Sequence, residues 1–172
     1  MSEFSLTVIG HWGAYPNCGE TTSCYLLQAE ETSVLLDCGS GALSVLQEHM
    51  SLADIDAVIL SHYHADHMAD LGCLQYAALI DMDLHRRQNP LMVYGHDEYA
   101  HTNILSFRDC VLGATYNRNS LLEIGPFRFS FVPTAHPDPC FAIRADCGSA
   151  SLVYSGDTEP CWELVPFSEG AD

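Results

Sequence analysis

Short hydrophobic runs separated by turn residues dominate the first part of this chain. Gly, Pro and Asn stand between the runs, which is the arrangement expected of strands joined by turns. We predict strands over residues 4–9, 24–28, 34–37, 56–60 and 91–94. Helical segments are expected between several of them, and strands that alternate with helices predict an α/β fold.

Two of the intervening segments are expected to be helical. Leu43, Leu46 and Met50 recur on one face of a helix that Ser40 is placed to cap. Another helix is expected near residues 97–107. Strands and helices therefore alternate over this part of the chain.

From residue 121 the pattern changes to successive strands. Gly125, Pro126 and residues 147–149 supply turns between them. A run of strands after an alternating segment predicts a second sheet that packs on the first. The length of 172 residues and the hydrophobic content of 48% fit one domain over residues 1–172.

Residues 61–67 read SHYHADH and place three histidines and an aspartate directly after a hydrophobic run. Imidazole and carboxylate groups bind first-row metals, of which zinc is the commonest occupant. Side chains two positions apart on an extended segment point the same way, so His62 and His64 can bind one ion. Asp66 and His67 then face a second ion. The segment predicts a metal site.

A helix is expected to follow this motif from about Met68. Leu71, Leu74 and Ala78 share one face of that helix. The polar and charged residues 80–89 are expected to form an exposed connection to the next strand. The predicted order is therefore strand, ligand loop, helix.

The motif resembles the signature of the metallo-β-lactamase fold superfamily, which is His-x-His-x-Asp-His at the end of a strand. Three further segments resemble that family. They are residues 34–40 (VLLDCGS), with Asp37 in the Asp-x-Gly position, residues 133–136 (PTAH) and residues 153–158 (VYSGDT). The resemblance covers most of the chain.

The resemblance narrows to one branch of the superfamily. The Ser-Gly-Asp-Thr variant and residues 9–16 and 22–27 are most similar to the ribonuclease Z-like branch. That branch includes tRNA 3′-processing enzymes, cyclic-nucleotide phosphodiesterases and many uncharacterised bacterial hydrolases. This chain is most similar to the last group.

The resemblance implies a ligand set and a chemistry. The first metal would be held by His62, His64 and His136, the second by Asp66 and His67, and both by a bridging Asp157. Two zinc ions per chain are expected, with Mn²⁺ or Fe²⁺ as alternatives, and a metal-bound hydroxide would be the nucleophile. Asp66 is also the candidate for proton transfer, whereas Asp37 would support the ligand loop without binding metal.

One departure from the family pattern affects the second metal. The family normally supplies a further histidine downstream of the bridging aspartate, and this chain has none after Asp157. We therefore expect an α/β fold of the four-layer αββα type that lacks its C-terminal portion; an intact protein with an altered second site is the alternative. The remaining histidines are expected at the surface or in loops: His11, His49, His85, His96 and His101. Of these, His11 lies in a loop that resembles one bordering the family's cleft.

The charge balance bears on the partners. The formal net charge is −17, and the chain has six arginines and no lysine. Proteins that bind nucleic acid neutralise phosphates with Lys or Arg, so this composition weighs against such a partner. We expect a small-molecule substrate and leave a homodimer open.

The sequence gives no sign of export or of membrane insertion. No hydrophobic run approaches the ~18 residues of a membrane span, and the start lacks a basic stretch before an apolar core. A cytoplasmic location is the expectation. The eight cysteines show no Cys-x-x-Cys spacing, so most are expected to be packed side chains rather than ligands or disulfides.

Several functions fit these residues. A di-zinc phosphodiesterase is favoured, because the Ser-Gly-Asp-Thr branch is rich in that chemistry. Hydrolysis of a lactone, thioester or β-lactam would use the same hydroxide. A mononuclear iron sulfur-dioxygenase would need only His62, His136 and Asp157, and an inactive truncated remnant is the last alternative. Tyr63 is expected either to face substrate or to pack behind the loop, and Thr21 to Ser23 either to bind phosphate or to form a turn.

Overall fold

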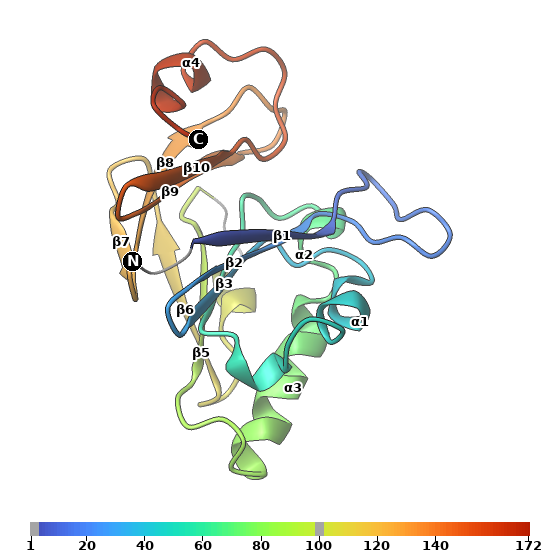
Figure 1. Ribbon diagram of the computed structural model, residues 1–172. Coiled ribbons are helices and arrows are strands. Elements are labelled where there is room, and N and C mark those ends of the chain that lie inside the picture. Colours follow the sequence, from blue (N-terminus) through green and yellow to red (C-terminus); the bar gives the residue numbers. More distant parts are fainter. Residues whose placement is uncertain (1–3, 99–101) are drawn as a thin grey trace.

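Two β-sheets pack face to face in the computed structural model, which describes residues 4–98 and 102–172 (Figure 1). The first sheet has six strands in the order of the sequence: β1 (Ser5–Gly10), β2 (Cys24–Ala29), β3 (Thr32–Leu36), β4 (Ala57–Ile59), β5 (Leu91–His96) and β6 (Val111–Tyr116). The pairs β1–β2 and β2–β3 are antiparallel, whereas β3 to β6 are parallel. The carboxyl ends of these parallel strands therefore meet at one edge of the sheet.

The second sheet is antiparallel. Its strands are β7 (Leu122–Ile124), β8 (Phe127–Pro133), β9 (Phe141–Cys147) and β10 (Ala150–Tyr154), in the spatial order β10-β9-β8-β7. Gly125 and Gly148 both have positive φ angles, of 54° and 60°, in the tight turns between these strands. The predicted second sheet and both of its predicted turns are confirmed.

The helices are few and lie mainly on one side of the first sheet. They are α1 (Ala42–Leu46), α2 (Ala65–Met68), α3 (Leu71–Asp83) and α4 (Leu164–Phe167), with 3-10 turns at Leu52–Asp54 and Thr102–Leu105. Leu71, Leu74 and Ala78 are buried on α3, as the periodicity predicted. Figure 1 shows α1 and α3 together on the face of the sheet that lies away from β7–β10.

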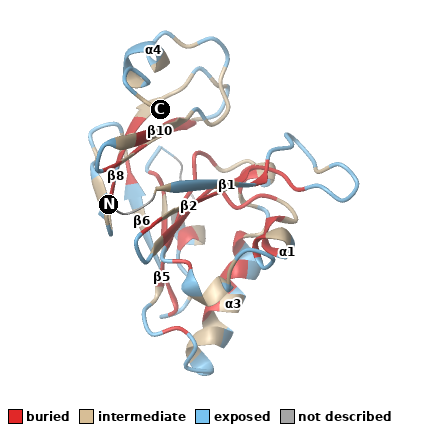
Figure 2. Ribbon diagram, viewed as in Figure 1, coloured by how far each residue is buried: buried red, intermediate tan, exposed pale blue. Residues whose placement is uncertain are grey.

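Two hydrophobic cores hold these layers together. One lies between the first sheet and its helices, and the other lies between the two sheets. Strand β4 contributes to both, because Val58 faces the helices while Ala57 and Ile59 face the second sheet. All three side chains are fully buried, as expected for a central parallel strand covered on both faces. Figure 2 shows buried residues, in red, along β2 and β5 of the same sheet.

The expected layers α, β and β are therefore present. Among the described residues, α4 is the only helix near the outer face of the second sheet. Arg144, on β9, donates to the carbonyls of Phe167 and Glu169 at 2.9 and 3.0 Å, which holds the α4 segment against that face. Within the described residues, no helix is long and apolar enough to cross a bilayer.

Some predicted elements were wrong in detail. Ser40 does not cap α1: the backbone N–H of Ser40 donates to Thr22, and Gly41 precedes the helix in the left-handed region with φ 79°. The predicted exposed connection begins later than residue 80, because α3 continues to Asp83. The helix expected near 97–107 is a single 3-10 turn within its described part, and residues 99–101 lie outside the described residues.

Candidate metal centre

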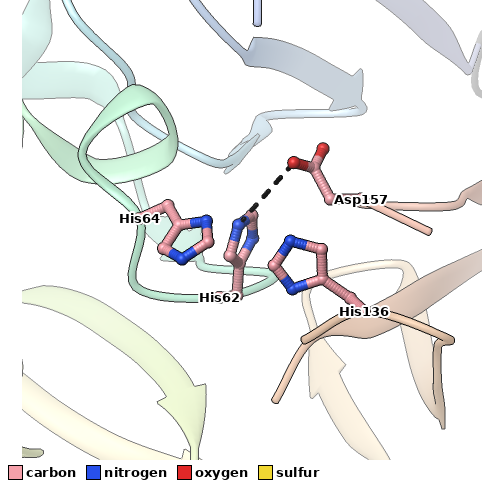
Figure 3. Close-up of side chains that lie close together, drawn as sticks. All are labelled: His62, His64, His136 and Asp157. Carbon is pink, nitrogen blue, oxygen red and sulfur yellow. Dashed lines mark ion pairs between the residues drawn. The ribbon is translucent and has the colours of Figure 1, made fainter. Parts of the chain in front are cut away.

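The six predicted ligands come together at the carboxyl edge of the parallel strands. They form two groups that share one residue: the first is His62, His64, His136 and Asp157, and the second is Asp66, His67 and Asp157. Within each group the potential ligand atoms lie within 4.8 Å of one another. Figure 3 shows the three imidazoles of the first group beside one another, with the Asp157 carboxylate next to the ring of His62. Their roles as ligands remain predictions that this geometry supports.

The backbone explains why one short segment serves both groups. His64 has an extended backbone, with φ and ψ of −69° and 150°. Helix α2 then begins at Ala65, earlier than the expected start near Met68. Asp66 and His67 therefore lie on the first turn of a helix, and their side chains point to a different side from those of His62 and His64.

His136 and Asp157 reach the same place from the second sheet. His136 follows β8 and Asp157 follows β10. Nε2 of His62 lies 3.9 Å from Oδ2 of Asp157, and Nε2 of His67 lies 3.3 Å from Oδ1 of the same carboxylate. One carboxylate thus has an oxygen facing each group, as a bridging ligand requires.

Two buried ring nitrogens in the site lack a hydrogen-bond partner and are free to bind a cation. Nε2 of His62 and Nε2 of His67 are buried without a hydrogen-bond partner in the described structure. A buried unpaired polar atom costs about 1–3 kcal/mol, which a ligand bond would remove. Burial, helped by the neighbouring His67, lowers the pKa of His62 to about 4. His62 is therefore neutral at pH 7 and has a free lone pair, which fits a metal ligand.

Asp37 holds the ligand loop, residues 61–67, in place through hydrogen bonds, as the resemblance implied. The fully buried carboxylate accepts hydrogen bonds from the Ser61 backbone N–H (2.7 Å), the Ser61 hydroxyl (2.8 Å), His67 Nδ1 (2.7 Å) and the Tyr154 hydroxyl (2.7 Å). Burial alone lowers the pKa of His67, but the hydrogen bond and charge of Asp37 outweigh it, so the pKa is raised. With Nδ1 occupied, His67 presents Nε2 toward Asp66 and Asp157.

Asp138 contacts two of the predicted ligands, and sequence reasoning missed it. Its carboxylate Oδ2 lies 2.6 Å from Nε2 of His64, and its backbone carbonyl lies 2.8 Å from Nδ1 of His136. The only sequence signal was an acidic residue two positions after His136, which is too common to indicate a role.

The loop between β1 and β2 reaches the second group. The backbone N–H of Ala14 donates to Oδ2 of Asp66 at 2.7 Å. This contact brings the loop that contains His11 to the edge of the site, although the His11 side chain is itself exposed. Thr21 and Thr22 are buried and hold backbone in place, because Thr21 Oγ1 donates to Ile9 and Thr22 Oγ1 accepts from Ser40. For this segment the structure therefore favours a role in holding the backbone turn over a role in binding phosphate.

Tyr63 packs behind the ligand loop, since its hydroxyl donates to the carbonyl of His96 at 2.8 Å. His96 corrects an expectation, because it is fully buried rather than at the surface. Its ring lies among aromatic side chains at the end of β5, with its centroid 5.4 Å from that of Phe141. His49 and His85 are exposed as expected, whereas His101 lies outside the described residues.

Comparison with known proteins identifies the family. The profile of the Metallo-beta-lactamase superfamily matches residues 19–169. The probable metallo-hydrolase YhfI of Bacillus subtilis is 40% identical over 168 residues, covering 97% of this chain and 69% of that protein. The crystal structure of YhfI superposes with a TM-score of 0.94 over 97% of this chain and 68% of that chain. This chain belongs to the metallo-β-lactamase superfamily.

Other relatives locate the branch. The uncharacterised protein Rv1339 of Mycobacterium tuberculosis is 33% identical over 187 residues, with 97% of this chain and 64% of that protein covered. Ribonuclease Z of Methanopyrus kandleri is 29% identical over 146 residues, with 84% and 50% covered. These relatives confirm the ribonuclease Z-like branch and, with the YhfI structure, the predicted fold class. The chain spans between half and about two thirds of the length of these relatives.

Proposed function

We propose that this protein is a metal-dependent phosphodiesterase that acts on a small substrate and binds two zinc ions. The proposal rests on the two groups of predicted ligands that share Asp157. Each group contains a buried histidine Nε2 atom that has no hydrogen-bond partner. A site for one ion would not explain why Asp66 and His67 lie on the free side of the same carboxylate. Nε2 of His67 is 3.3 Å from Oδ1 of Asp157 and 3.6 Å from Oδ2 of Asp66. The arrangement therefore favours two metals over the mononuclear iron alternative.

Two zinc ions at such a site would lower the pKa of a shared water and polarise a phosphoryl oxygen. The chain's own groups would do the rest. Asp37 and Asp138 hold three of the imidazoles through their other ring nitrogens. Asp66, at the edge of the second group, is the candidate to hold or pass a proton. The loop between β1 and β2 contacts it through the backbone N–H of Ala14.

The substrate is proposed to be small because all six arginines, which lie within the described residues, already have partners in the protein. Four of the six arginines, Arg86, Arg118, Arg128 and Arg144, pair with acidic side chains. Arg87 is buried and donates to the carbonyls of Leu52, Ile55 and Asn89. Arg108 lies over the ring of Phe107, before β6 at the opposite edge of the sheet.

A phosphodiester bond is favoured over a carbonyl substrate on the strength of the relatives. The matched branch includes proteins named ribonuclease Z, and a ribonuclease cleaves phosphodiester bonds. The net charge of −17 disfavours binding of a long polyanion such as RNA. The proposed substrate is therefore smaller than RNA, even if the bond cleaved is the same.

The test is hydrolysis of bis(p-nitrophenyl) phosphate by the zinc-loaded protein, beside a lactone, a thioester and a β-lactam. We expect release of p-nitrophenol that falls at least 100-fold in His136→Ala and Asp157→Asn. Asp109→Asn removes the same charge as Asp157→Asn at an exposed position before β6 and should leave the rate unchanged. Turnover of a carbonyl substrate alone, or inertness with zinc bound, would overturn the phosphodiesterase proposal.

A further inference from the structure

Asp138 lies in the loop between β8 and β9 and connects the two sheets at the metal site. Its carboxylate pairs with His64, which follows β4 of the first sheet. Its backbone carbonyl pairs with His136, which follows β8 of the second sheet. One residue therefore contacts two predicted ligands of the first metal, and these come from different sheets. The contacts use Nε2 of His64 and Nδ1 of His136, which leaves Nδ1 of His64 and Nε2 of His136 for a metal.

We infer that Asp138 is a positioning residue that fixes the tautomers of His64 and His136. The inference rests on the proposed metal site. A neutral imidazole carries one N–H and one lone pair, so the nitrogen that donates decides which nitrogen can bind metal. When Nε2 of His64 donates to the Asp138 carboxylate, the lone pair of His64 is on Nδ1. When Nδ1 of His136 donates to the Asp138 carbonyl, the lone pair of His136 is on Nε2.

The exposure of the pair favours positioning over stability. The side chains of His64 and Asp138 are 42% and 58% exposed. Ion pairs this exposed contribute little to folding, about 0–1 kcal/mol. A carboxylate behind a metal-binding histidine, in contrast, typically changes metal affinity by about 10–100-fold. The same contact is therefore expected to matter much more for metal binding than for folding.

The loop is built to keep this exposed aspartate in one place. Pro137 and Pro139 flank Asp138, and each proline fixes its own φ and restricts the residue before it. The loop is also tied to the other side of the site, because Thr134 Oγ1 donates to the carbonyl of Asp157 at 2.8 Å. A flexible loop would lose conformational entropy when it holds His64. The two prolines restrict this loop beforehand, so the entropy lost on forming the contact is smaller.

The experiment compares Asp138→Ala and Asp138→Asn with the charge-matched control Asp109→Asn. Zinc affinity is measured by competition with a chromogenic chelator, and histidine tautomers are read from long-range ¹H–¹⁵N spectra of the metal-free protein. We expect Asp138→Ala to weaken the first zinc about 10–100-fold and to mix the two tautomers of His64. Asp138→Asn retains an amide oxygen as acceptor, so it should restore part of the affinity and keep the Nε2–H tautomer. The control should match the wild type.

Three results would overturn the inference. Zinc affinity within twofold of the wild type in Asp138→Ala is the first, and an unchanged His64 tautomer in that variant is the second. The third is a fall in the melting temperature of the metal-free variant by as much as a core substitution would cause, because the aspartate would then be structural. None of these readouts uses a substrate. Inertness toward phosphodiesters would therefore refute the proposed function without refuting this inference.

Discussion

Replacing Asp37 with asparagine is expected to destabilise the protein and, at the same time, to weaken metal binding at the proposed second site. The carboxylate is fully buried and accepts four hydrogen bonds, three of them on Oδ2. Asp37 also has a positive φ of 60°, a conformation that asparagine tolerates. The substitution therefore changes the hydrogen bonding without changing the backbone preference.

The magnitude follows from the number of acceptors. An amide has one oxygen, so if it replaces Oδ2 its NH₂ group faces the backbone N–H of Ser61, and that buried donor is left unpaired. The other three bonds lose their charge. Removing one member of a buried ionic network costs about 3–5 kcal/mol. For a chain of this size that corresponds to about 6–20 °C in melting temperature.

The assay is urea unfolding of the metal-free protein followed by circular dichroism, with zinc affinity measured separately. Asp109→Asn, exposed and at the far edge of the sheet, is the control and should unfold like the wild type. We expect Asp37→Asn to lose affinity chiefly at the Asp66, His67 and Asp157 group, because His67 loses its anchor. An unfolding free energy within about 1 kcal/mol of the wild type would refute the reasoning, since a single good hydrogen bond is worth that much.

Three further predictions test the same network. Tyr154→Phe removes one of the four donors and should cost about 1.5–3 kcal/mol in the same unfolding assay; no loss would mean that the 2.7 Å contact contributes nothing. Gly39→Ala would place a Cβ 2.2 Å from the backbone oxygen of Asp66, so it should lower both stability and zinc affinity, whereas Gly72→Ala, with open space around it on α3, should be neutral or slightly stabilising by thermal melting. Zinc at 100 times its dissociation constant should add about 2.7 kcal/mol of stability; calorimetry should show a rise that EDTA reverses, and an unchanged melting temperature would contradict the metal site.

The convergence of the predicted ligands that are close in sequence was the easiest part of the site to predict. His62, His64, Asp66 and His67 lie within one strand–loop–helix unit, where the spacing alone indicates direction. His136 and Asp157 came from the family resemblance, because no local rule shows that two strand ends in another sheet reach the same point. The structure brings these residues together as the resemblance implied.

The misses have physical reasons. Strand β6 was not predicted because Gly113 interrupts its hydrophobic pattern. A Cβ at Gly113 would lie 2.5 Å from Cβ of Leu105, so the glycine allows the neighbouring 3-10 turn to approach the strand closely. His96 was expected at the surface because its burial depends on which aromatic residues the second sheet brings over it. Asp138 was missed because its role depends on the shape of a loop.

The hydroxyl of Tyr154, at the end of β10, bonds to Asp37, just beyond β3, and the predicted ligands divide between the same two sheets. A nascent chain that has emerged only through the first sheet contains four of the six predicted ligands. It still lacks His136, the third imidazole of the first group, and the shared carboxylate of Asp157. Tight metal binding at the proposed site would then wait until residue 157 has left the ribosome and the sheets have docked. Metal binding would therefore follow the docking of the two sheets, and chelator resistance during synthesis would measure when they dock.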